Sequence, residues 1–383
     1  MPASADPLKL LHDAGVSIWL DFIERELLRN GELERRIRDD SLTGMTSNPT
    51  IFEKALAEGT AYDDQIRTAP GDVTASELFE LIATTDVRDA CDIFRAVYER
   101  EKGTDGFVSI EVSPAAAHDL LGTISEAERL WSTVDRRNVL IKVPGTREGA
   151  DAVRRLIANG INVNITLLFS LDAYRRVIDA YIAGLEQRVE QGKEIRGLAS
   201  VASFFVSRVD TEVDKRLDAL AKSASGEQRA RIDGLRGKAA IANAKLAYRI
   251  FEAEFSSPRF KKLAAKGAAV QKVLWASTST KNPSYRDVMY VEQLIGPHTV
   301  NTMPPQTLDA FRDHGAVART VDQNLAAAEG VIRDLANIGI SIDDVTDKLL
   351  VDGLASFQKS FDNLIAGLAK KTKALGRDLV ASR

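Results

Sequence analysis

The fold is decided by one stretch of sequence, Val139-Leu140-Ile141-Lys142-Val143-Pro144. Its nearly continuous apolar character predicts a strand that is buried on both faces, as in a parallel sheet covered by helices. Lys142 interrupts this run, and a buried ammonium is so costly that a buried lysine tends to lose its proton. A neutral amine at the end of a strand is a nucleophile for a carbonyl carbon. The alternative is a structural lysine that only forms a salt bridge with a neighbouring carboxylate.

Seven further apolar segments are separated by amphipathic helical patterns. They cover residues 17–21, 42–46, 106–112, 161–167, 198–205, 270–276 and 298–303. Strands that alternate with helical crossovers in this way predict an α/β fold, a closed (β/α)8 TIM barrel. A doubly wound sheet is the alternative. It usually has a glycine-rich first turn, and the sequence contains neither GxGxxG nor GxxxxGK[ST].

The remaining length of the chain is helical in pattern. We expect one barrel domain over residues 1–383, with helical insertions at about residues 75–102 and 208–266. The C-terminal segment, about residues 321–383, has no strand pattern and predicts two or three helices packed outside the barrel. The spacing Thr50-x-x-Glu53 predicts a capping box, and Ser170 is the predicted N-cap of a helix that follows it.

The composition excludes several classes of protein. The chain has 51 Lys and Arg residues against 55 Asp and Glu residues, so no basic excess indicates nucleic-acid binding. No apolar run approaches the roughly 18 residues that span a membrane, and the N-terminus has no signal-peptide pattern. The single cysteine, Cys91, excludes an intramolecular disulfide and fits a reducing cytoplasm. The four histidines have no metal-ligand spacing, so we expect no metal site.

Polar residues gather at the C-terminal ends of the predicted strands, where (β/α)8 barrels carry their active sites. They are Asp21, Asn48, Glu111, Lys142, Asn164, Thr166 and Ser203. Each has a structural explanation of its own, since Asn48 could cap the next helix and Glu111 could be a rim charge. Packing requires none of them there, because apolar residues would be less costly to bury. Their concentration at one rim therefore favours a catalytic site.

Lys272 is an internal comparison for Lys142. It also lies in an apolar strand, but near the N-terminal end of that strand. This end of a barrel contributes to stability, so Lys272 is predicted to be structural or to extend its ammonium toward water.

The residue types at the catalytic rim suit Schiff-base cleavage of a carbon–carbon bond. A neutral lysine adds to a ketone, and loss of water gives an imine that accepts electrons when the bond breaks. Carboxylates move the protons, while amides and hydroxyls hold the oxygens of a polyol. This chemistry needs no metal.

At these residues the sequence resembles the transaldolase family. The matching stretches are residues 19–21 (WLD), 44–49 (GMTSNP), 108–112 (VSIEV), 139–144 (VLIKVP), 164–170 (NITLLFS) and 203–208 (SFFVSR). The resemblance implies a cofactor-free class I aldolase barrel of the non-oxidative pentose phosphate pathway. Such an enzyme transfers a dihydroxyacetone unit from sedoheptulose 7-phosphate to glyceraldehyde 3-phosphate, giving erythrose 4-phosphate and fructose 6-phosphate.

The resemblance also implies catalytic roles. Lys142 would be the Schiff-base nucleophile, and Asp21 would be the acid/base for carbon–carbon cleavage. Glu111, through a water held with Thr166, would carry protons during imine formation and hydrolysis.

The implied substrate-binding residues are Asn48 and Asn164 for the dihydroxyacetone hydroxyls, with Ser203 beside them. Arg208 would bind the sugar phosphate. Many family members have a second phosphate-binding arginine after the seventh strand, but residues 275–282 (WASTSTKN) contain none. Lys281 could replace it as a point charge, or could be a solvated loop lysine.

Two other functions remain as alternatives. A simple aldolase would release free dihydroxyacetone, but such relatives are much shorter chains. A non-catalytic sugar-phosphate binder would be expected to lack the lysine or the carboxylates, and both are present. We therefore expect a cytoplasmic enzyme, monomeric or homodimeric, that acts on small-molecule sugar phosphates and binds neither nucleic acid nor membrane.

Overall fold

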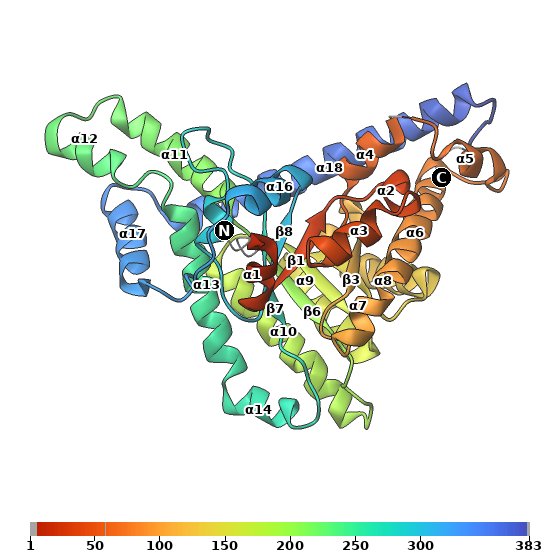
Figure 1. The fold of residues 1–383 in the computed structure, drawn as a ribbon, viewed down its shortest axis with the longest axis horizontal. Coiled ribbons are helices and arrows are strands. Elements are labelled where there is room, and N and C mark those ends of the chain that lie inside the picture. Colours follow the sequence, from red (N-terminus) through yellow and green to blue (C-terminus); the bar gives the residue numbers. More distant parts are fainter. Residues whose placement is uncertain (1–5, 58, 381–383) are drawn as a thin grey trace, which may run out of the picture.

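Eight parallel strands form a closed barrel in the computed structural model, which describes residues 6–57 and 59–380 (Figure 1). Each strand pairs with the next one along the chain, and the eighth pairs with the first. The strands are β1 (Val16–Asp21), β2 (Leu42–Thr46), β3 (Phe107–Glu111), β4 (Val139–Pro144), β5 (Val163–Leu168), β6 (Ser200–Phe205), β7 (Lys272–Ala276) and β8 (Thr299–Met303). The prediction of a (β/α)8 barrel is confirmed.

Helices follow every strand and occupy most of the remaining chain. Those before β3 are α1 (Pro7–Asp13), α2 (Arg25–Arg29), α3 (Glu32–Asp39), α4 (Pro49–Ala57), α5 (Asp63–Thr68), α6 (Ala75–Ile93) and α7 (Arg95–Arg100). Between β3 and β6 lie the 3-10 helix η1 (Pro114–His118), α8 (Leu120–Val134), α9 (Arg147–Asn159) and α10 (Leu171–Glu190). The later helices are α11 (Ser207–Ala221), α12 (Gly226–Asp233), α13 (Ala239–Phe255), α14 (Pro258–Ala264), α15 (Met289–Glu292), α16 (Pro305–His314), α17 (Leu325–Asn337) and α18 (Ile342–Ala374).

Strand β4 is buried along its whole length, as its apolar sequence predicts. In the register of the barrel, Lys142 lies beside Glu111 of β3 and beside Asn164 of β5. Residues in register on neighbouring strands point to the same face of a sheet. The pairing therefore places these three polar side chains in one layer near the C-terminal end of the barrel.

Large side chains fill the opposite, N-terminal part of the barrel. Trp19 packs there with Phe107, and a β-carbon on Gly44 would lie 2.5 Å from the Trp19 indole nitrogen. Glycine at position 44 therefore makes room for the tryptophan ring. The Lys272 ammonium donates a hydrogen bond to the Ser17 hydroxyl (3.0 Å) and lies 3.8 Å from the carboxylate of Asp105. Lys272 is thus a structural lysine, as its position in the strand predicts.

Helix α4 begins differently from the predicted capping box. The side-chain oxygen of Asn48 accepts a hydrogen bond from the Ile51 backbone N–H (3.1 Å), and Pro49 is the first helical residue. Proline is preorganised for this first position, so Asn48 is the cap and the prediction for Thr50 is wrong. The Thr50 hydroxyl instead donates to the hydroxyl of Ser360 in α18 (2.9 Å). Ser170 caps α10 as predicted.

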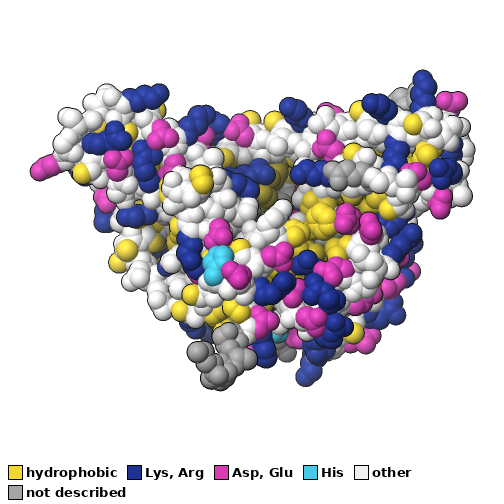
Figure 2. All heavy atoms as spheres, turned by 45° about the horizontal axis from the view of Figure 1, so that its top comes forward, with side chains coloured by type: hydrophobic (Ala, Val, Ile, Leu, Met, Phe, Trp, Pro, Cys, Tyr) yellow, Lys and Arg dark blue, Asp and Glu magenta, His cyan; other side chains and the backbone are white. Residues whose placement is uncertain are grey.

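The C-terminal segment forms α17, which packs against α13, and the 33-residue helix α18. Figure 1 shows α18 running across one end of the barrel, with α11 to α14 on one side and α4 to α8 on the other. It packs against α4, α6 and α11. Despite its length, neither α18 nor any other helix in the described part of the chain is long and apolar enough to cross a membrane. Basic and acidic side chains are interspersed over the face shown in Figure 2.

Candidate active site

A cavity of about 500 Å³ occupies the C-terminal mouth of the barrel beneath α18. Eight of the nine predicted site residues line it: Asp21, Asn48, Glu111, Lys142, Thr166, Ser203, Arg208 and Lys281. The remaining one, Asn164, is fully buried and does not line the cavity. The strand ends thus bring together side chains that lie far apart in the sequence.

Lys142 and Glu111 form a close pair in this cavity. The lysine Nζ donates a hydrogen bond to Glu111 Oε2 (3.0 Å) and a longer one to the Ser47 carbonyl (3.4 Å). Only 10% of the Lys142 side chain and 7% of the Glu111 side chain are exposed. Burial raises the pKa of Glu111. The positive charge of Lys142 opposes this rise, and the negative charge of Asp21 adds to it. A carboxyl with a raised pKa beside an amine can exchange a proton with it or with an attached substrate.

Asp21 is oriented by two threonines. The Thr46 hydroxyl donates to Asp21 Oδ1 (2.8 Å) and lies 2.9 Å from the hydroxyl of Thr302 in β8. Both threonines are buried and line the cavity. The sequence analysis did not identify Thr302. Its position, a polar residue near the C-terminal end of the predicted eighth strand, is the signal that could have identified it.

A buried chain of hydrogen bonds connects three strands below the cavity. The Ser203 hydroxyl donates to Asn164 Oδ1 (2.7 Å), and Asn164 Nδ2 donates to the Ser109 hydroxyl (3.0 Å). Because Asn164 does not line the cavity, its direct effect in this structure is to hold Ser203 in place.

Strand β5 contains an irregularity at the site. Its register with β6 shifts between Ile165 and Leu168, and Leu167 has a φ of 59°. Successive side chains of a regular strand point to opposite faces, but here both Thr166 and Leu167 line the cavity. A positive φ is unfavourable for leucine, so the surrounding packing must hold this conformation in place.

Positive charge gathers at the side of the cavity formed by α11 and the loop after β7. Arg208 lies in the first turn of α11, half-buried, with its guanidinium carbon 5.2 Å from the centre of the Phe205 ring. Among the described residues no carboxylate lies within salt-bridge distance of it. Burial lowers the pKa of Arg208, and the negative charge of Asp21 opposes this decrease. A half-buried guanidinium without a carboxylate partner favours an anionic ligand.

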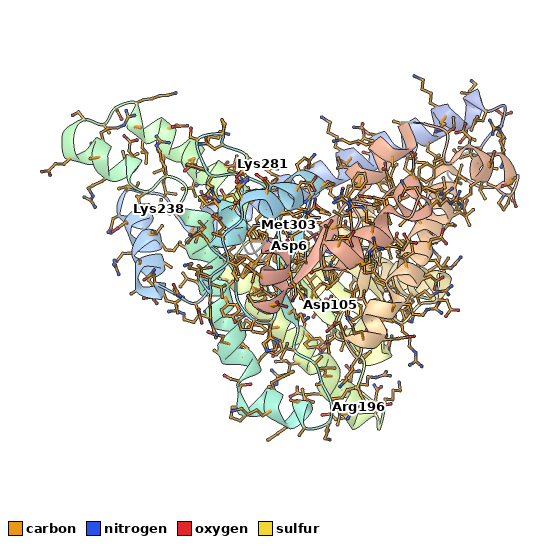
Figure 3. The ribbon with its side chains drawn as sticks, in the orientation of Figure 1. Asp6, Asp105, Arg196, Lys238, Lys281 and Met303 are labelled. Atoms are coloured by element: carbon orange, nitrogen blue, oxygen red, sulfur yellow. The ribbon has the colours of Figure 1, made fainter. Side chains whose placement is uncertain are left out.

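Lys281 lines the same side of the cavity, and Figure 3 shows it near the end of the barrel covered by α18, with Asp105 toward the other end. Its Nζ donates to the Ser279 hydroxyl (2.7 Å). Although the residue is largely exposed, partial burial of its ammonium and then the positive charge of Arg208 lower its pKa. An anion bound between these two cations would relieve their repulsion. Arg208 itself lies in the first turn of α11, at the helix end where the backbone dipole favours an anion.

Helix α18 supplies the roof of the cavity through residues that the sequence analysis missed. They are Gly353, Ser356, Phe357 and Ser360. Their spacing of three, four and seven residues places them on one face of the helix. A β-carbon on Gly353 would lie 3.2 Å from Leu167 Cδ2, so this glycine permits the close approach of α18 to β5.

The closed barrel, the buried lysine at the end of β4 and its carboxylate partner define a Schiff-base enzyme barrel of the class I aldolase type. The model of the family Transaldolase/Fructose-6-phosphate aldolase matches residues 18–368. The chain belongs to this family.

Curated relatives resemble the chain over nearly its full length. A protein of Frankia alni named transaldolase is 48% identical over 376 residues, which cover 98% of this chain and 100% of the relative. A transaldolase of Thermobifida fusca is 49% identical over 370 residues, covering 96% and 99%. A transaldolase of Trichodesmium erythraeum is 47% identical over 369 residues, covering 95% and 97%.

Proposed function

We propose that the chain is a transaldolase that moves a dihydroxyacetone unit from sedoheptulose 7-phosphate to glyceraldehyde 3-phosphate. The observation that carries this proposal is the buried Lys142–Glu111 pair at 3.0 Å, in one cavity with the cationic side formed by Arg208 and Lys281. A keto group at the lysine and a phosphate at the cations fit the two ends of a ketose phosphate. The enzyme acts in the cytoplasm, as a monomer or a homodimer.

The reaction begins with the amine of Lys142. Its neutral form adds to the C2 carbonyl of the ketose and gives a carbinolamine. Glu111, acting through a water held with Thr166, protonates the departing hydroxyl, and loss of water leaves a protonated imine. Because burial raises its pKa, Glu111 can hold the proton that this step requires.

Carbon–carbon cleavage follows at Asp21. Its carboxylate, oriented by Thr46, takes the proton of the C4 hydroxyl as the C3–C4 bond breaks. The bond electrons move to the imine and form an enamine, while the aldose phosphate leaves. The acceptor aldehyde then binds, the enamine carbon attacks its carbonyl carbon, and Asp21 returns the proton to the new hydroxyl. Water added with the help of Glu111 releases the product ketose from Lys142.

Other residues hold the sugar. Arg208 and Lys281 bind the phosphate, and Asn48 and Ser203 hold the hydroxyls of the three-carbon unit. Asn164, which the resemblance to the family assigns to these hydroxyls, acts on them through Ser203, which it holds in place. The roof formed by α18 limits the access of water to the enamine, which favours transfer to an acceptor over protonation and release.

The test is an assay that separates transfer from simple cleavage. With fructose 6-phosphate and erythrose 4-phosphate as substrates, the enzyme should form sedoheptulose 7-phosphate and glyceraldehyde 3-phosphate in equal amounts. With fructose 6-phosphate alone it should release little dihydroxyacetone. Release of free dihydroxyacetone at the rate of transfer would instead identify a fructose 6-phosphate aldolase, the other activity in the name of the family.

A further inference from the structure

A second cavity, of about 800 Å³, lies between α4, α6, α8, α18 and the end of β3. Three residues contribute to the walls of both this cavity and the catalytic one: Asn48, Pro49 and Glu111. The strand-to-helix turn after β2 and the catalytic carboxyl of β3 thus separate the two spaces. The mechanism above uses none of the other residues around the second cavity.

The walls of the second cavity are largely apolar and aromatic. Phe52 of α4, Phe79 of α6 and Phe361 of α18 all line it. The Phe79 ring meets the other two rings edge-on, with ring centres 5.4 Å and 5.9 Å away. The volume falls within the roughly 300–1,000 Å³ of small-molecule sites, which combine apolar walls with a few polar groups.

The charged groups around this cavity are mostly acidic. Four glutamates line it, and Arg129 is the one basic residue in the described lining; the glutamates are Glu77, Glu80, Glu111 and Glu126. Arg129 is already engaged, because it donates to both carboxylate oxygens of Glu80 (2.9 and 2.7 Å) and lies 3.9 Å from Glu126. Hydrogen bonds from the Thr74 backbone and hydroxyl lower the pKa of Glu77, so it stays ionised. Glu111 is paired with Lys142 and Glu80 with Arg129, so the excess of negative charge comes from Glu77 and Glu126. This excess favours a cation and repels an anion.

We propose that the second cavity is a binding site for a small organic cation with an apolar body, such as a protonated amine that carries an aromatic ring. The faces and edges of the three phenylalanine rings receive the apolar body. The acidic rim attracts the ammonium group, and a ring face can add a cation–π contact. The catalytic cavity offers the opposite environment, with Arg208 and Lys281 on its wall.

Occupancy of the second cavity should affect catalysis through Glu111. A positive charge near this carboxyl favours its ionised form and so opposes the rise in pKa that burial causes. The bound cation therefore makes the pKa of Glu111 lower. The limb of the activity–pH profile that reports Glu111 should move to lower pH when the cation is bound.

Binding can be measured by titration calorimetry with 2-phenylethylammonium, its neutral analogue 2-phenylethanol and the anion 3-phenylpropanoate. The cation should bind at least about tenfold more tightly than either analogue, which corresponds to about 1.4 kcal/mol. Glu80→Gln and Phe79→Leu should each weaken cation binding roughly fivefold. The matched control is Glu186→Gln on α10, which breaks a comparable surface pair with Arg259 of α14 and should leave binding unchanged.

Three results would overturn the proposal. The first is equal binding of the cation and its neutral analogue, and the second is binding that neither cavity variant weakens. The third is a crystal structure with the cation bound elsewhere. If the cation binds in this cavity but the activity–pH profile does not move, the coupling to Glu111 is wrong. None of the binding readouts depends on turnover, so they remain valid if the assigned reaction is incorrect.

Discussion

Replacement of Glu111 by glutamine separates proton transfer from sugar binding. Glutamine has nearly the volume of glutamate and keeps an oxygen that can accept the hydrogen bond from Lys142 Nζ, which is 3.0 Å away in the wild-type site. What it loses is the ability to take up and release a proton. Positioned acid–base groups contribute roughly 10²–10⁴-fold to rates. The variant should therefore lose about 10²–10³-fold in kcat, while KM for fructose 6-phosphate changes less than about threefold.

The substitution leaves the amine of Lys142 in place, with a hydrogen-bond acceptor still beside it. A net loss of rate then reports on dehydration of the carbinolamine and not on nucleophilic attack.

The assay is single-turnover trapping of the imine with borohydride, compared with sugar binding measured by calorimetry. Glu186→Gln on α10 is the control for a generic loss of a carboxylate. If Glu111→Gln weakens sugar binding and leaves the rate of imine formation unchanged, the role assigned to Glu111 is wrong.

Three further predictions concern other parts of the site and fold. Arg208→Gln should raise KM for phosphorylated sugars roughly tenfold to a hundredfold, and Lys281→Gln, at an exposed residue, should raise it less than about tenfold. Steady-state kinetics measure both values. Wild-type KM in both variants would reject the anion site. Gly353→Leu should destabilise the fold by about 1–3 kcal/mol in denaturant unfolding, because its β-carbon already meets Leu167 at 3.2 Å. Gly367→Leu, in open space on the same helix, should not, and equal losses would contradict close packing of α18 on β5. Burial raises the pKa of Asp210 to about 6, so the native protein binds more protons than the unfolded chain between pH 4 and 6. The free energy of unfolding should fall by about 3 kcal/mol as pH rises through this range, and Asp210→Asn should remove this slope; equal slopes in the two proteins would refute the assignment.

The barrel and most of the rim could be predicted because both depend on local pattern. The apolar runs gave the strands to within two residues of their observed ends, and the barrel rule then placed Lys142 and Glu111 at one rim. Asn164 lies on β5 beside Lys142, but the sequence does not show that its side chain is fully buried and does not line the cavity. Which side chains of β5 reach the cavity depends on side-chain packing and on the irregularity at Leu167, for which the sequence has no clear signal.

The long-range features could not be predicted. The C-terminal segment has a helical pattern, but this pattern does not say that α18 returns across the barrel mouth to roof the cavity. The pairing of Thr50 with Ser360 joins residues more than three hundred positions apart. The second cavity is likewise formed only when four helices and β3 pack together, so no local sequence pattern predicts it.

The most direct test of the central claim is the identity of the lysine that carries the substrate. The protein is incubated with fructose 6-phosphate, reduced with borohydride and mapped by peptide mass spectrometry, alongside Lys142→Met and Lys272→Met variants. A three-carbon adduct should appear on Lys142 in the wild type and in Lys272→Met, and no adduct should form in Lys142→Met. An adduct on Lys272, or none on the wild-type protein, would contradict the account.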